Sequence, residues 1–295
     1  MGSRAADMLG RVLARTQTKV VARVLLAAAT AALLLPQPAA AAHYYVALGD
    51  SLAAGFEAGP SVPGSGYVDR IYSRLRSRQH DLQLVNVACL GTTSATLQSG
   101  DLCTGAAGPQ LTQAVRFLRS HRGSISLVTI DIGGNDIGAS CGSSPTLACI
   151  HATIPGVIDN LRTIAVDLRA AAGRRTPIVG MNYYDPGLSE WFGGPAERAL
   201  VPTTIKVLDT LDRGIATGYA AGSIAVADVE AAFHTRDLRH RVVLAGRGRV
   251  PAAVADICRW TGACEQPQNV HGTAAGYGVI AGAFWRAIEP LLAAR

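Results

Sequence analysis

Apolar residues of this chain gather in short runs that end at glycine, asparagine, aspartate or a polar loop. Runs of this kind, rich in aliphatic and β-branched residues and bounded by turn formers, are typical of buried strands. We therefore predict five strands, at Tyr44–Leu48, Leu82–Ala88, Ser126–Ile132, Pro177–Asn182 and Ser223–Asp228.

The segments between and after these runs carry apolar residues at every third or fourth position, the spacing of one helix face. The predicted helices are Tyr67–Gln79, Pro109–Ser120, Ile154–Ala172, Ala196–Gly218 and Ala274–Ala293. Strands that alternate with helices indicate a parallel sheet covered on both faces, and hence an α/β fold. Residues 231–270 show no sustained period, and we interpret them as a long loop with a little helix.

The first 42 residues have the layout of an export signal. A basic stretch precedes the apolar core Val24 to Leu35, and a run of alanines ends at Ala42. This order predicts a cleaved signal peptide over 1–42, cut after Ala40-x-Ala42, and a secreted single domain over 43–295. An uncleaved signal anchor is the alternative, although the core is short for a membrane span.

The basic character of the chain comes mostly from this leader. Removal of its five basic residues and of Asp7 leaves 22 basic and 20 acidic residues, and lowers the net charge from +6 to +2. Because no Lys/Arg run interleaved with aromatic residues is present, nucleic acid is not an expected partner. We expect a monomer whose partner is a small molecule.

All six cysteines follow the leader, which fits an oxidising compartment. Six cysteines allow fifteen pairings. We favour pairing between neighbours, because each such bridge would tie a loop beside one of the motifs described next. The pairs are Cys89 with Cys103, Cys141 with Cys149, and Cys258 with Cys264. Metal-type Cys/His spacing is absent, so no metal site is expected.

Ser51 is the first candidate for chemistry. It follows the first predicted strand and Gly49-Asp50, at the strand end where open α/β sheets place their ligands. Gly49 allows the sharp turn that would project the serine. Asp50 is interpreted as an acid that stabilises this turn rather than a catalytic one.

Three further segments supply the groups that a nucleophilic serine needs. Gly91, just past the second strand, offers a bare backbone N–H, and Asn135 after the third strand offers an amide donor. His271 lies before the last helix and is a candidate base. If these segments converge on one sheet edge, then a nucleophile, oxyanion donors and a base share one cleft.

These four blocks resemble those of the SGNH (GDSL) hydrolases, closest to the secreted actinobacterial-type lipases and esterases. The resemblance implies a three-layer, flavodoxin-like α/β/α sandwich of about five parallel strands, and hydrolysis of carboxylic esters without a cofactor. It implies Ser51 as nucleophile, His271 as base, and an oxyanion hole made by Ser51, Gly91 and Asn135. Asp136, in the same block as Asn135, is open to a structural role.

One departure from the family pattern concerns the residue that orients the histidine. The family usually has Asp three positions before the His, where this chain has Gln268. We therefore expect a Ser51-His271 dyad in which the carbonyl or side chain of Gln268 orients the imidazole. Glu265 and Asp256 are acids that a different loop path would bring close.

Other enzyme classes lack their motifs. Neither a P-loop nor Gly-x-Gly-x-x-Gly follows a strand. A secreted binding protein that has lost catalysis is the alternative from another class, and a carbohydrate O-deacetylase is the alternative within the family. The segment Gly187–Gly194 is interpreted as an apolar wall or lid, or as a loop packed by Trp191 and Phe192.

Overall fold

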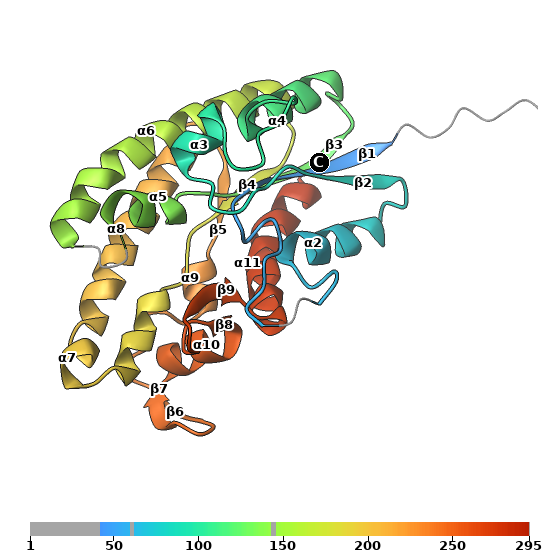
Figure 1. The fold of residues 1–295 in the computed structure, drawn as a ribbon. Coiled ribbons are helices and arrows are strands. Elements are labelled where there is room, and N and C mark those ends of the chain that lie inside the picture. Colours follow the sequence, from blue (N-terminus) through green and yellow to red (C-terminus); the bar gives the residue numbers. More distant parts are fainter. Residues whose placement is uncertain (1–41, 60–61, 143–145, 295) are drawn as a thin grey trace, which may run out of the picture. The chain divides into compact units, whose positions relative to one another are not determined.

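A five-stranded parallel sheet lies at the centre of the computed structural model, which describes residues 42–59, 62–142 and 146–294. The strand order is β2-β1-β3-β4-β5 (Figure 1). The bounds are β1 His43–Gly49, β2 Leu82–Asn86, β3 Ile125–Asp131, β4 Ile178–Met181 and β5 Ala225–Ala227. All five predicted strands are confirmed, whereas the predicted signal peptide lies outside the described residues.

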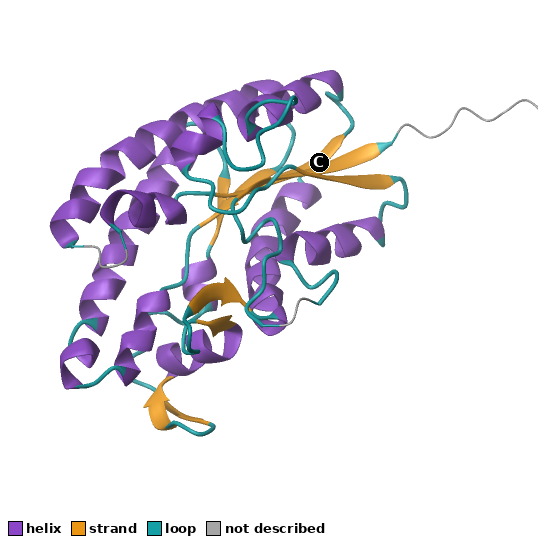
Figure 2. Cartoon of the chain, in the orientation of Figure 1, coloured by secondary structure: helices purple, strands orange, loops and turns teal. Residues whose placement is uncertain are grey.

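Helices cover both faces of the sheet, as Figures 1 and 2 show. One layer contains α3 Ser94–Ser99, α4 Gln110–Ser120, α5 Gly134–Cys141, α6 Leu147–Ala172 and α8 Val201–Ala220. The other contains α2 Tyr67–Arg76 and α11 Ala274–Ala293, with α9 Val229–Ala232 and α10 Ala252–Trp260 against α11. The central strand β3 is buried along its whole length, as a strand covered on both faces must be.

Two helices differ most from their predicted bounds, whereas α2 ends three residues early and α4 begins one residue late. α6 begins at Leu147 rather than Ile154, because the Thr146 hydroxyl accepts a hydrogen bond from the Cys149 N–H and caps an earlier start. The predicted helix Ala196–Gly218 is divided into α7 Pro195–Arg198 and α8. Pro202 lies in the first turn of α8, where its missing N–H costs nothing, so the longer helix begins there.

Residues 231–270 are more ordered than predicted. They form the antiparallel hairpin of β6 Arg241–Leu244 and β7 Gly248–Pro251, the helix α10, and a small pair of β8 Thr261–Gly262 with β9 Asn269–Gly272. The prediction of a long loop was therefore wrong. Strands of two to four residues are too short to give a clear period.

The strand order creates a crevice at one edge of the sheet. In a 2-1-3-4-5 sheet the connections reverse direction between β1 and β3, which opens a crevice at the carboxyl ends of those two strands. Ser51 follows β1 and Asn135 follows β3. The fold therefore brings the first and third sequence blocks to the same crevice.

Each disulfide joins neighbouring cysteines, in the pairing that the sequence favoured. The bridges are Cys89–Cys103, Cys141–Cys149 and Cys258–Cys264. Among the helices of the described residues, none has the length and apolar character needed to cross a bilayer.

Gly276 fixes the start of α11, just after the candidate His271. A Cβ at this position would lie 1.9 Å from the Trp260 carbonyl oxygen, a backbone atom that cannot move aside alone. We predict that Gly276→Ala lowers the free energy of unfolding by about 3 kcal/mol. Gly278→Ala is the matched control in the same helix, since its Cβ would meet only the Arg70 guanidinium at 3.7 Å. Equal denaturation midpoints for the two variants would contradict the prediction.

Candidate active site

Ser51 lies in the turn that follows β1. Gly49 ends that strand with φ +141°, a conformation that residues with a side chain rarely adopt. A Cβ there would lie 2.0 Å from Oδ1 of Asp131, so the turn can come this close to β3 only at a glycine. Ser51 is 9 % exposed and therefore borders solvent without projecting into it.

His271 reaches Ser51 across 220 positions of sequence. Its Nε2 lies 2.8 Å from the Ser51 Oγ, which is hydrogen-bonding distance. The histidine is carried by β9, which pairs with β8 and leads into α11. The structure therefore brings together the two residues that the sequence singled out as nucleophile and base.

Asn269, rather than Gln268, faces the other ring nitrogen. Its Oδ1 lies 2.6 Å from the His271 Nδ1. The Gln268 side chain points elsewhere and donates to the Ser189 hydroxyl at 2.9 Å. The expectation that the Gln268 side chain orients the imidazole is therefore wrong, and Asp256 is also elsewhere, paired with His234 at 2.8 Å.

The geometry of β9 explains this correction. Side chains two positions apart on a strand share a face, whereas a side chain three positions away does not. Asn269 and His271 are two apart and are half-buried, while Val270 between them is exposed. The alternation Asn-Val-His before the final helix was the sequence signal that could have identified Asn269 as the residue beside the imidazole.

A second hydrogen bond fixes which way the Asn269 amide points. The backbone N–H of His271 donates to the same Oδ1 at 3.0 Å. Only the oxygen end of an amide can accept this bond, so the oxygen and not the NH2 group faces Nδ1. Nδ1 then carries the proton, and Nε2 is left free to accept one from Ser51.

The two candidate oxyanion segments lie against each other. Gly91 has φ +73°, and nothing lies within 4 Å of where its Cβ would be, so the glycine is required by backbone conformation and its surroundings are open. The Asn135 amide donates to the Thr92 carbonyl at 3.0 Å, which holds it beside the Gly91 turn. Since the NH2 group has two hydrogens, one remains for a ligand.

Asp136 has a structural role in this arrangement. Its carboxylate accepts from the Ser94 N–H at 2.8 Å and from the Ser94 hydroxyl at 2.6 Å. It therefore joins the first turn of α5 to the start of α3, just beyond Gly91. The structural interpretation of Asp136 agrees with these contacts.

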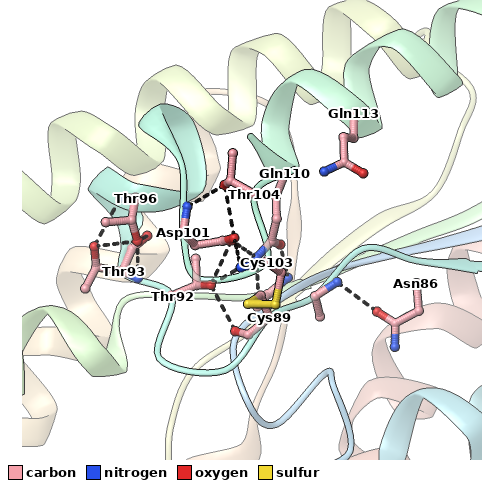
Figure 3. Close-up of a disulfide and its surroundings, with 12 residues drawn as sticks. Asn86, Cys89, Thr92, Thr93, Thr96, Asp101, Cys103, Thr104, Gln110 and Gln113 are labelled. Carbon is pink, nitrogen blue, oxygen red and sulfur yellow. Dashed lines mark hydrogen bonds between the residues drawn. A yellow bond between two sulfur atoms is a disulfide. The ribbon is translucent and has the colours of Figure 1, made fainter. Parts of the chain in front are cut away.

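Gln110, a buried residue that the sequence analysis missed, connects the nucleophile turn to the Gly91 loop. Its amide accepts from the Gly49 N–H at 3.2 Å and donates to the Gly49 carbonyl at 3.1 Å. The same NH2 group lies 3.0 Å from the Thr92 hydroxyl and 2.6 Å from Asp101. Figure 3 shows Gln110, Thr92 and Asp101 converging beside the Cys89–Cys103 bridge. A helical glutamine has no sequence signal for such a role.

Two buried carboxyl groups lie beneath the serine. Asp50 accepts from the Leu52 N–H at 2.9 Å, the contact expected of a turn-stabilising acid, and Asp131 accepts from the Tyr67 hydroxyl at 2.8 Å. Burial raises the pKa of both carboxyls, and the charge of Asp50 raises the pKa of Asp131 further. Both shifts favour the protonated form of the pair relative to carboxyls in water.

The surroundings of His271 favour the neutral form of its imidazole. Burial lowers its pKa below the ordinary value, because the charged form is less well solvated there. The Phe56 ring packs edge-on against it, with ring centroids 4.7 Å apart. A neutral imidazole is the form that accepts a proton.

A depression of about 490 Å³ adjoins His271. Its walls are one loop and one aromatic ring: Phe56, Glu265, Gln266, Pro267, Gln268, Asn269, Val270 and His271. Trp191 and Phe192 do not line it and are instead covered by arginines, Arg198 and Arg241 over Trp191 and Arg247 over Phe192. The segment Gly187–Gly194 forms most of a 3-10 helix over Pro186–Phe192, and both aromatic residues pack partly buried against the core.

Within the described residues, one group of potential metal ligands comes together, Asp101 with Cys89 and Cys103. The two sulfur atoms are joined in a disulfide, so they are not thiolate ligands. The contact between the Ser51 hydroxyl and the His271 imidazole forms without a metal ion.

Several solved structures resemble this fold over most of the chain. LAE5, an alpha/beta hydrolase from the metagenome of Lake Arreo, has a similar structure with a TM-score of 0.50 at 21 % identity, covering 85 % of this chain and 97 % of its own. Axe2, an acetylxylan esterase from Geobacillus stearothermophilus, has a TM-score of 0.51 at 18 % identity, covering 83 % and 94 %. A putative GDSL-like lipase from Parabacteroides merdae has a TM-score of 0.54 at 13 % identity, covering 84 % and 95 %. These likenesses show the SGNH-type α/β fold.

A search of curated proteins gave no match. The sequence profile of the GDSL-like Lipase/Acylhydrolase family, in contrast, matches residues 47–279, well over half of the chain, and this stretch includes Ser51, Gly91, Asn135 and His271. The chain therefore belongs to the GDSL-like lipase and acylhydrolase family, whose members are carboxylic ester hydrolases.

Proposed function

We propose that this protein is a secreted serine esterase or lipase that acts as a monomer through Ser51, His271 and Asn269. The observation that carries the proposal is the 2.8 Å contact between the Ser51 Oγ and the His271 Nε2. All the proposed groups come from one chain, so a second copy is not needed. Secretion rests on the sequence of residues 1–42 and is supported by three disulfides.

The proposed reaction has two steps. The Ser51 Oγ bonds to the ester carbonyl carbon while its proton passes to the His271 Nε2, and the carbonyl oxygen becomes an oxyanion. The backbone N–H groups of Ser51 and Gly91 and the Asn135 amide stabilise that oxyanion. The imidazolium returns the proton to the leaving alcohol, and water then cleaves the acyl-serine by the same route.

Asn269 replaces the carboxylate usual in such sites as a positioning residue. Its oxygen selects the tautomer with the proton on Nδ1, which is one of the two tasks of the acid in a serine triad. It lacks the negative charge that would stabilise the imidazolium, which is the other task. The proposed site therefore relies on orientation more than on charge compensation at the histidine.

The substrate class is proposed from the depression beside His271, where the leaving alcohol would lie. Phe56 and Val270 offer apolar contact, which suits a lipid or a simple ester. The amides of Gln266 and Gln268 and the carboxylate of Glu265 favour the second candidate, a carbohydrate O-deacetylase. Axe2, which has a similar fold, is described as an acetylxylan esterase.

Ser51→Ala provides the first test. We predict that the purified protein hydrolyses p-nitrophenyl esters, and that this variant loses turnover by about 10⁴-fold or more, because no nucleophile is left. Activity that falls steeply from acetate to palmitate would favour the deacetylase, and acetylated xylan would then be the next substrate. A folded protein without turnover on any of these esters, and without Ser51 labelling by an organophosphonate, would favour the inactive binding protein.

Asn269→Ala and Gln268→Ala form a matched pair of neighbours. We predict a fall in kcat of about 10²-fold for Asn269→Ala, because the imidazole loses the acceptor that fixes its tautomer. Gln268→Ala is expected to stay within about threefold, since its side chain bonds Ser189 and not the ring. The opposite order in steady-state kinetics would return the orienting role to Gln268.

The pH dependence of kcat/KM tests the state of His271. Burial lowers the pKa of this imidazole, so the neutral base persists to lower pH. The midpoint of the acid limb of kcat/KM should therefore lie below about pH 6.5, the ordinary histidine value. Asn269→Asp puts a negative charge beside Nδ1, which favours the protonated ring, so the limb should move up by about 1 pH unit. An unchanged profile in this variant would show that residue 269 does not contact the histidine.

A further inference from the structure

The β6–β7 hairpin and the residues around it carry an excess of positive charge. From Leu238 through Ala255 the chain has no acidic residue and four arginines. They are Arg239, Arg241, Arg247 and Arg249. All four are exposed, and Figure 1 shows the hairpin projecting at the edge of the molecule below α10.

The two faces of this hairpin differ sharply. Val250 and Leu244 point inward and are buried, and Val242 is half-buried on the same side. On the opposite face, Val243 pairs directly with Arg249, and Arg241 lies two positions away on the same strand. Val243 is 64 % exposed there, an aliphatic side chain on the same face as two arginines.

The positive charges of this outer face are not neutralised. Within the described residues, none of the ion pairs involves Arg239, Arg241, Arg247 or Arg249. Arg241 packs over the Trp191 ring, and the Arg249 guanidinium donates only to the Arg241 carbonyl at 3.4 Å. These contacts hold the arginines in place and leave their charge available to an anionic partner.

The hairpin also adjoins the candidate site. Arg247 packs over the Phe192 ring and donates to the Cys264 carbonyl at 2.6 Å. Cys264 directly precedes Glu265, the first residue of the loop that lines the depression beside His271. A surface that binds the hairpin therefore comes close to the entrance of the site.

We propose that the outer face of the β6–β7 hairpin, formed by Arg241, Val243 and Arg249 with Arg239 and Arg247 beside it, docks on anionic phospholipid membranes. Guanidinium groups bind phosphate oxygens in pairs, and each basic residue near an anionic leaflet adds to the affinity. Val243 supplies the apolar contact for the interface beneath the headgroups. A short two-stranded face suits a flat membrane surface better than it suits an extended polyanionic chain as its partner. The inference does not depend on the proposed reaction.

Vesicle co-sedimentation of the purified protein tests this directly. We expect binding to vesicles of equal parts phosphatidylcholine and phosphatidylglycerol, weaker binding as salt rises, and little binding to phosphatidylcholine alone. Arg241→Gln with Arg249→Gln should lower the partition coefficient about 30-fold. The matched control, Arg116→Gln with Arg119→Gln on α4, removes the same charge from exposed arginines elsewhere and should bind within about threefold of the unchanged protein.

Val243→Asp gives a second route to the same answer if the double variant does not fold. Its side chain is exposed, so the fold should tolerate the change, while a negative charge on the outer face should weaken binding about tenfold or more. Equal losses in the hairpin and α4 variants would overturn the proposal. So would binding to a sulfated polysaccharide resin without binding to anionic vesicles, which would assign the face to a polyanionic carbohydrate.

Discussion

The edge of the sheet that carries the candidate site depends on the close approach of Gly49 to Asp131. The two residues are register partners at the ends of β1 and β3, and the space a side chain at position 49 would fill is taken by the carboxyl of Asp131. This contact brings the serine turn down onto the central strand. Tyr67 and the Ala53 N–H hold the carboxyl from below, and Gln110 holds the Gly49 peptide from the side. The serine turn is thus held by buried side chains that bond its backbone, those of Asp131 and Gln110.

The sequence predicted the strands and most of the candidate residues at this edge, because buried strands require apolar runs that are visible in the sequence. Five apolar runs predicted five strands, and the residues just after the first and third runs lie at the crevice of the sheet. Ser51 and His271, which the sequence singled out by chemical type, lie within hydrogen-bonding distance of each other. Long-range order of this kind is visible in sequence when each strand is long enough to show its apolar pattern.

What the sequence did not predict lies in short elements and in polar contacts that cross between them. The β8–β9 pair is too short to show a period, so the sequence did not reveal the face shared by Asn269 and His271. The orienting role was therefore predicted for Gln268, three positions before the histidine. Gln110 looks like any polar residue at the start of a helix until the fold brings Gly49 and Thr92 to its amide. Hydrogen-bond partners that only the tertiary fold brings together leave no pattern in the local sequence.

The three disulfides each brace a segment that carries one part of the site. Cys89 lies beside Gly91, Cys141 ends the helix that begins next to Asn135, and Cys258–Cys264 supports the strand that pairs with β9. The bridges span 14, 8 and 6 positions, so each restricts the unfolded chain somewhat less than a long-range link would. Each bridge also keeps the two ends of a short segment together in the folded protein. Order at this edge is thus linked to the redox potential of the surroundings, while the sheet beneath it, which contains no cysteine, is not.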